Sequence, residues 1–166
     1  MASWSELEAA APDLAARART LLDAHVHKTL ATLRRDGAPR ISGTEILFAE
    51  GELWFGSMAG ALKARDLQRD ARFALHSGSD DPPGWAGDAK LAGRAVEEHD
   101  PARKAAVFSS RAPEEGEPED ADHSDSHLFR ADIAELSIVG LNEARDRLVI
   151  ELWTADGGEV RRMERA

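Results

Sequence analysis

The sequence predicts a mainly β fold with short α-helices, arranged as a closed or nearly closed antiparallel barrel. Three observations lead to this prediction. Strand-like segments follow one another along most of the chain, tight turns rather than helical crossovers join the first three, and closure of such a sheet removes unpaired edges. The 166 residues, 42% of them hydrophobic, suffice for one domain with its own core. The absence of cysteine excludes a disulfide scaffold and a thiolate zinc site.

Two helices are expected at the N-terminus. Ser5 and Glu8 have the spacing of a capping box, and Pro12 interrupts or restarts the helix behind them. From Asp13 to Val26, apolar residues recur at three- and four-residue intervals, which predicts a second, amphipathic helix. We therefore expect residues 1–27 to form helices that pack on a barrel domain of residues 28–166.

Turn signals and alternating segments predict the strands, six or seven of which we expect to form the barrel. Asp36-Gly37 is a hairpin signal between strands at 29–33 and 40–48, and Ala49-Glu50-Gly51 leads into a strand at 52–57. A short helix is expected at 61–69, and another from Asp100 to about Ser110. The remaining strands are expected at 72–77, 88–97, 128–130, 133–141 and 147–154.

The distribution of charge limits the classes of partner. The formal net charge is −10, but seven of the acidic residues lie in 113–127, a segment without Lys or Arg that we expect to be a solvated acidic loop, a lid or disordered. The rest of the chain carries −3, with a small basic cluster between Arg40 and Arg72. We expect no nucleic-acid partner. No apolar run approaches the ~20 residues that cross a bilayer, and the first residues are acidic, so we expect a cytoplasmic protein without a membrane partner.

The strongest local signal for chemistry is the run GELWFGSMAGALKARDLQRDAR at 51–72. A strand ends in small residues, and Lys63 stands near the start of the next helix, where helix N–H groups and an ammonium together favour an anion such as a phosphate monoester. The alternative is an exposed lysine on an amphipathic helix. The sequence has no dinucleotide fingerprint, no phosphate-binding loop and no nucleophile elbow, so an enzyme of this sequence would take its reactivity from a cofactor.

The histidines of the sequence do not predict a metal site. His25 and His27 are expected at the surface or at a helix end, and His123, Asp125 and His127 lie in the acidic segment. We predict no specific metal.

Four blocks in order resemble one family: TLRRDGAPRIS at 32–42, GELWFGSM at 51–58, LKARDLQRDARFAL at 62–75 and GDAKLAGRAVE at 87–97. Together they are similar to the pyridoxamine 5′-phosphate oxidase-like group of FMN-binding split barrels, over roughly residues 28–100. The resemblance implies a six-stranded antiparallel split β-barrel and a homodimer with cofactor sites at the subunit interface. It also implies flavin or deazaflavin redox chemistry.

The resemblance also assigns residues to the cofactor. It places Arg40, Ile41 and Ser42 along the flavin and its phosphate, Ser57 near the phosphate, and Lys63 on the phosphate. The oxidase has a Ser-Arg pair before this lysine, where this chain has Ala61-Leu62. Because a bidentate phosphate ligand is missing, this difference favours a similarity to relatives that use the deazaflavin coenzyme F-420. The cofactor-binding residues implied are Arg40, Ile41, Ser42, Gly43, Thr44, Phe55, Ser57, Leu62, Lys63, Asp88, Trp153 and Arg161.

Two functions from different classes remain open on the sequence. The first is an oxidoreductase that uses FMN or, alternatively, coenzyme F-420, and acts on a small organic substrate with no evident catalytic side chain of its own. The second is a non-catalytic split barrel that binds or sequesters flavin or haem.

Overall fold

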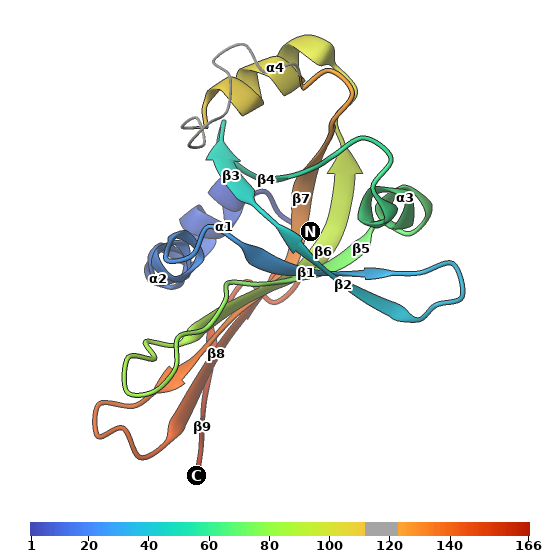
Figure 1. Cartoon of the computed structure of the whole chain (residues 1–166). Helices are drawn as coiled ribbons and strands as arrows, with labels where there is room; N and C mark the ends of the chain where they lie inside the picture. The colour runs from blue at the N-terminus through green and yellow to red at the C-terminus, as the bar shows by residue number, and fades with distance from the viewer. Residues whose placement is uncertain (112–122) are drawn as a thin grey trace.

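One antiparallel sheet of nine strands, with four short helices, makes up the part of the chain that the structure describes, residues 1–111 and 123–166 of a computed structural model (Figure 1). The mainly β, antiparallel fold predicted from the sequence is confirmed. The elements in chain order are α1 (Trp4–Ala10), α2 (Pro12–Asp23), β1 (Lys28–Leu33), β2 (Pro39–Thr44), β3 (Ile46–Ala49), β4 (Glu52–Ser57), α3 (Leu62–Arg69), β5 (Arg72–His76), β6 (Asp88–Glu97), α4 (Pro101–Ser109), β7 (His127–Leu141), β8 (Leu148–Thr154) and β9 (Arg161–Arg165).

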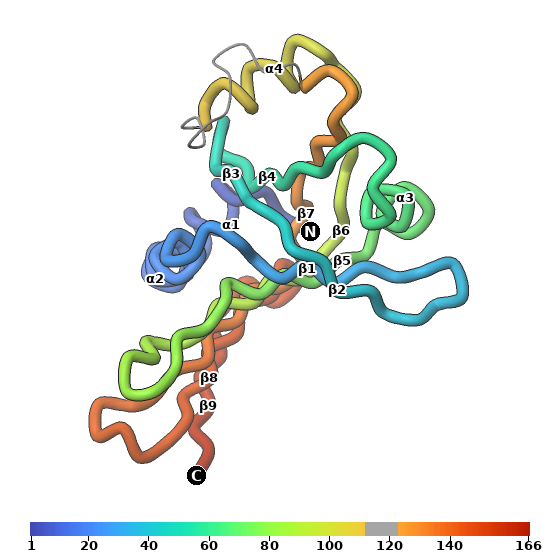
Figure 2. The backbone as a smooth tube through the Cα atoms, in the orientation of Figure 1, coloured from blue at the N-terminus to red at the C-terminus, as the bar shows by residue number. Residues whose placement is uncertain are grey.

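The order of the strands explains why the sheet closes. Neighbours run β2-β1-β5-β6-β7-β4-β3, and β8 and β9 extend the sheet from β7. β2 and β3 therefore stand at opposite ends of the path, although Glu45 alone separates them in sequence. The sheet has to curl until its two ends meet at Glu45, which gives a barrel. The trace in Figure 2 shows the barrel below α4, and β8 and β9 projecting away from it.

The strand boundaries differ from the sequence prediction in three places. The strand expected at 40–48 is broken at Glu45, the strands expected at 128–130 and 133–141 are continuous as β7, and the basic tail pairs with β8 as β9. β7 stays continuous although its pairing with β6 shifts register between Ala92 and Gly93, where Ala134 of β7 is the extra residue without a partner on β6. A Cβ at Gly93 would lie 2.0 Å from the carbonyl oxygen of Asp132, so this bulge requires glycine.

The capping box of α1 is formed by Ser3 and Glu6, so the prediction of Ser5 and Glu8 was wrong. Ser3 Oγ accepts from the Glu6 N–H at 3.1 Å, and the Ser3 N–H donates to Glu6 Oε2 at 2.8 Å. The earlier start places Trp4 in the first turn, where its indole donates to Glu8 at 2.7 Å. Burial of Trp4 and Leu7 thus sets the start of the helix.

The second helix ends earlier than its apolar pattern predicts. α2 ends at Asp23, and Val26 is exposed. Lys28 is buried, and its ammonium donates to the carbonyl oxygens of His25 and Val26. These contacts satisfy carbonyl groups just beyond the helix and turn the chain into β1.

The main core fills the barrel and includes the two N-terminal helices. Phe55 lies at its centre, with ring centroids 5.3 Å from Phe73 and 5.8 Å from Phe129. Trp4 from α1 and Leu22 from α2 belong to the same cluster. The domain boundary at residue 27 stays a prediction, but this shared core shows that the helices pack on the barrel.

A second, smaller cluster lies outside the barrel, under α4. It joins Trp54 from β4, Val107 from α4 and Leu128 from β7. α4 is thereby attached to the outer face of the strands that carry the pocket described below. Most of the acidic loop expected at 113–127 lies outside the described residues, while His127 already belongs to β7. Along residues 1–111 and 123–166, no helix has the length and apolar character to cross a membrane.

Candidate anion-binding pocket

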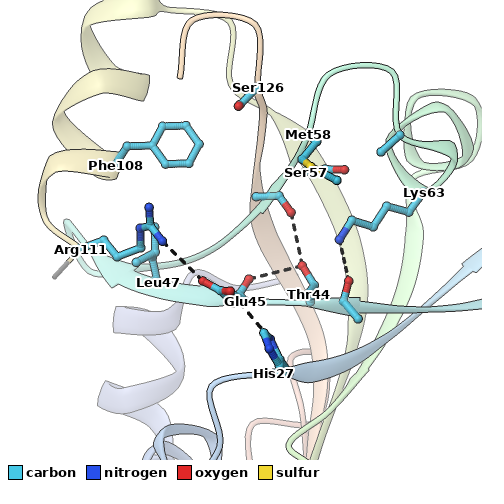
Figure 3. Close-up of a pocket in the computed structure, with 13 residues that line it drawn as sticks. His27, Thr44, Glu45, Leu47, Ser57, Met58, Lys63, Phe108, Arg111 and Ser126 are labelled. Carbon is cyan, nitrogen blue, oxygen red and sulfur yellow. Dashed lines mark hydrogen bonds and ion pairs between the residues drawn. The ribbon is translucent and has the colours of Figure 1, made fainter. Parts of the chain in front are cut away.

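A pocket of about 570 Å³ opens where the two ends of the curled sheet meet (Figure 3). Its walls come from the end of β2, β3, the end of β4, the start of α3 and the end of α4. The lining residues are His27, Gly43, Thr44, Glu45, Leu47, Gly56, Ser57, Met58, Ala61, Lys63, Phe108, Arg111 and Ser126. The volume lies within the range of small-molecule sites.

Lys63 supplies a cation at one wall of the pocket. It is the second residue of α3, and its ammonium donates to the Gly43 carbonyl oxygen at 2.6 Å. Burial lowers the pKa of Lys63, and the negative charge of Glu45 opposes this shift. An ammonium has three N–H donors, so the contact with Gly43 leaves two for a ligand.

Ser57 supplies a buried hydroxyl to the pocket. It ends β4 and is buried, and its Oγ has no hydrogen-bond partner among residues 1–111 and 123–166. A buried hydroxyl without a partner costs free energy of about 1–3 kcal/mol. Such a group on a pocket wall next to Lys63 is expected where a ligand completes the hydrogen bonding.

Glu45 lies between two basic side chains in the pocket. Its carboxylate is 3.6 Å from Arg111 Nη1 and 3.8 Å from His27 Nδ1. Figure 3 shows Glu45 on the floor of the pocket, between Arg111 and His27. The carboxylate balances part of the positive charge, so the pocket suits a ligand with one anionic group rather than a polyanion.

The remaining wall is apolar. Leu47 and Phe108 line it, and both pack against the small cluster beneath α4. Gly56 lies opposite, and a Cβ there would be 3.5 Å from the Phe108 ring. The lack of a side chain at Gly56 therefore leaves room beside an aromatic ring.

A comparison of the sequence with family models identifies the family. A family model described as pyridoxamine 5′-phosphate oxidase matches residues 14–140, which is most of the chain and includes all the strands around the pocket. This chain belongs to the pyridoxamine 5′-phosphate oxidase family. None of the curated proteins matches it significantly.

Solved structures with similar folds are consistent with this family. A pyridoxamine 5′-phosphate oxidase-related, FMN-binding protein from Nostoc punctiforme superposes with a TM-score of 0.61 at 16% identity, covering 100% of this chain and 98% of that one. A protein from Clostridium acetobutylicum, related to general stress protein 26, gives 0.60 at 15% identity, with 87% and 96% covered. A structure named F-420 reductase gives 0.54 at 21% identity, with 71% and 94% covered. These likenesses confirm the split-barrel fold.

Four of the residues that the family resemblance assigns to the cofactor line the pocket. They are Gly43, Thr44, Ser57 and Lys63. Thr44 ends β2, and its hydroxyl donates to the Gly56 carbonyl oxygen at 3.3 Å, which ties β2 to β4 at the pocket. The structure thus brings together residues that lie up to twenty positions apart in the sequence.

Four other predicted residues lie close to the pocket in sequence but do not line it. Arg40 Nε donates to Asp66 Oδ2 at 2.6 Å, and this carboxylate also accepts from Thr32 and Arg69. Arg40 is therefore engaged by a buried counter-ion. Ile41 and Leu62 are 75% and 56% exposed, and Ser42, half-buried on β2, is not among the lining residues.

The last four predicted residues are distant from the pocket or buried in the core. Phe55 is 1% exposed because its face of β4 points into the barrel. Trp153 is buried in the same core. Asp88 begins β6 and accepts from Ser79 and Trp85, at the end of the molecule away from α3 and α4, and Arg161 lies on exposed β9 (Figure 1). Within one chain, none of them reaches the pocket.

Several lining residues were not predicted from the sequence. Glu45 was predicted as part of a continuous strand at 40–48, although it is the one charged residue between Ile41 and Phe48. Phe108 and Arg111 come from the far end of α4 and carry no local signal. Only the packing of α4 on Trp54 and Leu128 brings them to the pocket.

Proposed function

We propose that this chain binds FMN, or alternatively coenzyme F-420, in the pocket and acts as an oxidoreductase on a small organic substrate. One observation carries the proposal: the Lys63 ammonium and the buried Ser57 hydroxyl, which has no partner in the described part of the chain, share one wall of a cavity of about 570 Å³. This is the donor set that a phosphate monoester requires.

The residues present fit such a cofactor. Lys63 and Ser57 would hold the phosphate, while Leu47 and Phe108 would cover an apolar ring system and exclude water from it. When bound, a flavin or deazaflavin supplies hydride transfer, which no side chain of this pocket provides. Thr44 holds β2 against β4 and so keeps the pocket walls in place.

A homodimer is part of the proposal. Four large apolar side chains that line the pocket or lie within two residues of a lining residue are exposed: Val26, Ile41, Met58 and Leu62 at 68%, 75%, 80% and 56%. A second copy that covers them would close the mouth of the pocket. The roles predicted for Asp88 and Arg161 require that copy, since within one chain they lie away from the pocket. The cytoplasmic location and the lack of a nucleic-acid partner stay predictions from the sequence.

Titration with FMN, riboflavin and F-420 tests the function. We expect FMN or F-420 to bind and riboflavin, which lacks the phosphate, to bind at least tenfold more weakly, because charge-assisted contacts of about 1.5–3 kcal/mol are lost. Ligand fluorescence measures all three affinities, and sedimentation with and without ligand measures the dimer. If neither phosphorylated cofactor binds, the proposal is wrong. If one binds but no hydride acceptor or donor turns over, the protein is a non-catalytic binding or sequestering barrel.

A further inference from the structure

A polar cluster closes the end of the barrel directly behind Ser57. His127 Nδ1 is 2.6 Å from Glu97 Oε1, and Gln68 donates to both oxygens of the same carboxylate, at 3.2 and 3.0 Å. The side chains of His127 and Glu97 are only 21% and 15% exposed. The three residues come from β7, β6 and α3, so tertiary packing alone assembles them.

Strand register places this cluster beside the pocket. Ser57 and His127 are direct partners in the antiparallel pair of β4 and β7, and the next inward pair is Phe55 and Phe129. The His127 ring stacks on Phe129, so it lies on the same inner face as Phe55 and Ser57. Side chains directly opposite each other have Cβ atoms about 4.5–5.5 Å apart, which brings the imidazole within reach of the serine hydroxyl by rotation about single bonds.

Glu97 determines which nitrogen of His127 carries a proton. Burial raises the pKa of Glu97, but hydrogen bonds from Gln68 and His127 lower it further, so its pKa lies below the ordinary value and the carboxylate is ionised. An ionised carboxylate only accepts, so His127 Nδ1 must donate to it. Nε2 is then an acceptor in the neutral imidazole and a donor in the imidazolium.

We propose that His127, oriented by Glu97, switches the direction of the Ser57 hydroxyl and thereby the affinity of the pocket for an anion. With the neutral imidazole, the hydroxyl donates to Nε2 and turns its lone pairs towards the pocket. With the imidazolium, Nε2–H donates to Ser57 Oγ, and the hydroxyl proton is directed at an anion beside Lys63. Anion binding is therefore stronger when His127 is protonated.

In this structure Ser57 Oγ is buried and makes no hydrogen bond to any described residue, His127 included, so a purely structural cluster would leave this hydroxyl unsatisfied. The switch requires the Ser57 side chain to turn towards His127 Nε2. The titratable groups that act on the cluster are Glu97 and, through its charge on Glu97, His99. His27 is the other histidine at the pocket, where it faces Glu45. The two histidines are therefore the rival sources of any pH dependence.

Inorganic sulfate is the probe because it stays dianionic between about pH 5 and 8, whereas a phosphate monoester titrates there. Its affinity is measured from the shift of the Lys63 amide in NMR titrations of the intact protein. We expect sulfate to bind about fivefold more tightly at the acidic end of this range, the difference between a charge-assisted and a neutral hydrogen-bond network. His127→Gln should remove this dependence, and His27→Gln should retain it.

A second measurement needs no variant. Linkage is reciprocal, so saturating sulfate must make the His127 imidazole of the wild-type protein take up its proton at a higher pH by the same factor. The inference rests on the proposed function, and the two fail differently. Failure of wild-type protein to bind sulfate and FMN at any pH overturns both. Binding that is independent of pH, or a dependence removed by His27→Gln and kept by His127→Gln, overturns only the switch.

Discussion

The two faces of β4 differ in what they contact: one packs in the barrel core, and the other borders α4 and the pocket. On the inner face, Leu53 and Phe55 are fully buried in the main core of the barrel. On the outer face, Trp54 packs under α4 in a separate small cluster, and Gly56 borders the pocket. The inner face is filled with apolar side chains from five further strands, whereas the outer face keeps a cavity beside one helix.

On β4, the residues that stabilise the fold and the residues that border the pocket therefore lie on opposite faces of one strand. Successive side chains of a strand point to opposite faces, so a core residue and a pocket residue can be neighbours in sequence. Ser57 is the exception that connects the two faces. It continues the inner row behind Phe55, yet it lines the pocket because the strand ends there.

Phe55→Ala should have the largest effect on stability. The ring packs between Phe73 and Phe129, and its removal leaves a cavity in the main core. We expect a loss of about 3–5 kcal/mol in the free energy of unfolding, measured by urea denaturation. Phe108→Ala, on the pocket side, is the control and should cost clearly less. Equal losses would show that the outer face is as important to the fold as the inner one.

Asp66→Asn should have the next largest effect, because Asp66 attaches the pocket helix α3 to β1 and β2. Burial raises the pKa of Asp66, but hydrogen bonds from Arg40, Arg69 and Thr32 lower it further, and its pKa lies below the ordinary 3.8. The variant leaves two arginines without their counter-ion, so we expect a loss of about 3 kcal/mol at neutral pH.

The pH dependence checks the sign of this effect. A carboxyl whose pKa is lowered by folding stabilises the protein above its unfolded value and loses that contribution as the pH falls towards its folded value. The stability curves of wild type and Asp66→Asn should therefore converge below pH 3.8. Asp70→Asn is the control: hydrogen bonds from Arg72 lower the pKa of Asp70 to about 2, but Arg72 is exposed and Asp70 partly exposed, so solvent screens the pair and stability should hardly change. A gap that persists in acid would contradict the role of the charge.

Lys63→Ala should affect binding rather than stability. The lost ammonium contact corresponds to about 1.5–3 kcal/mol, or roughly 10- to 150-fold weaker FMN binding. Riboflavin binding should be unchanged, since it has no phosphate. Lys90→Ala, on β6 outside the pocket lining, is the matched control and should bind FMN as the wild type does. Equal losses of affinity for FMN and for riboflavin would show that Lys63 does not bind the phosphate.

Gly56→Ala should have the smallest effect on stability. A Cβ there meets the Phe108 ring at an ordinary 3.5 Å, so the free energy of unfolding should change by less than about 0.5 kcal/mol. The methyl group enters the pocket, and FMN affinity should fall a few-fold. Gly93→Ala is the contrasting variant, since its Cβ would lie 2.0 Å from a carbonyl oxygen and should destabilise the barrel strongly. Comparable stabilities of the two variants would show that the bulge at Gly93 relaxes.

Local patterns predicted the elements better than their boundaries. Alternation and turn residues found β1, β4, β5 and β6, and the spacing of Lys63 after β4 placed the start of α3. The break at Glu45 was not predicted, because closure of the barrel requires it and no turn residue marks it in the sequence. Ser3 rather than Ser5 caps α1 because burial of Trp4 and Leu7 selects between two equally spaced candidates.

By itself, the sequence predicted the class of fold and, through the family resemblance, four of the lining residues, Gly43, Thr44, Ser57 and Lys63. The fold class depends on periodicity and turn residues, which are local, whereas the four residues follow from the order and spacing of the blocks that resemble the family. Only the tertiary structure decided that Arg40 is engaged by Asp66, that Phe108 and Arg111 form the opposite wall, and that Glu97 orients His127 behind Ser57. Each of these contacts joins elements far apart in sequence, and strand register and helix packing, which no local pattern encodes, bring them together.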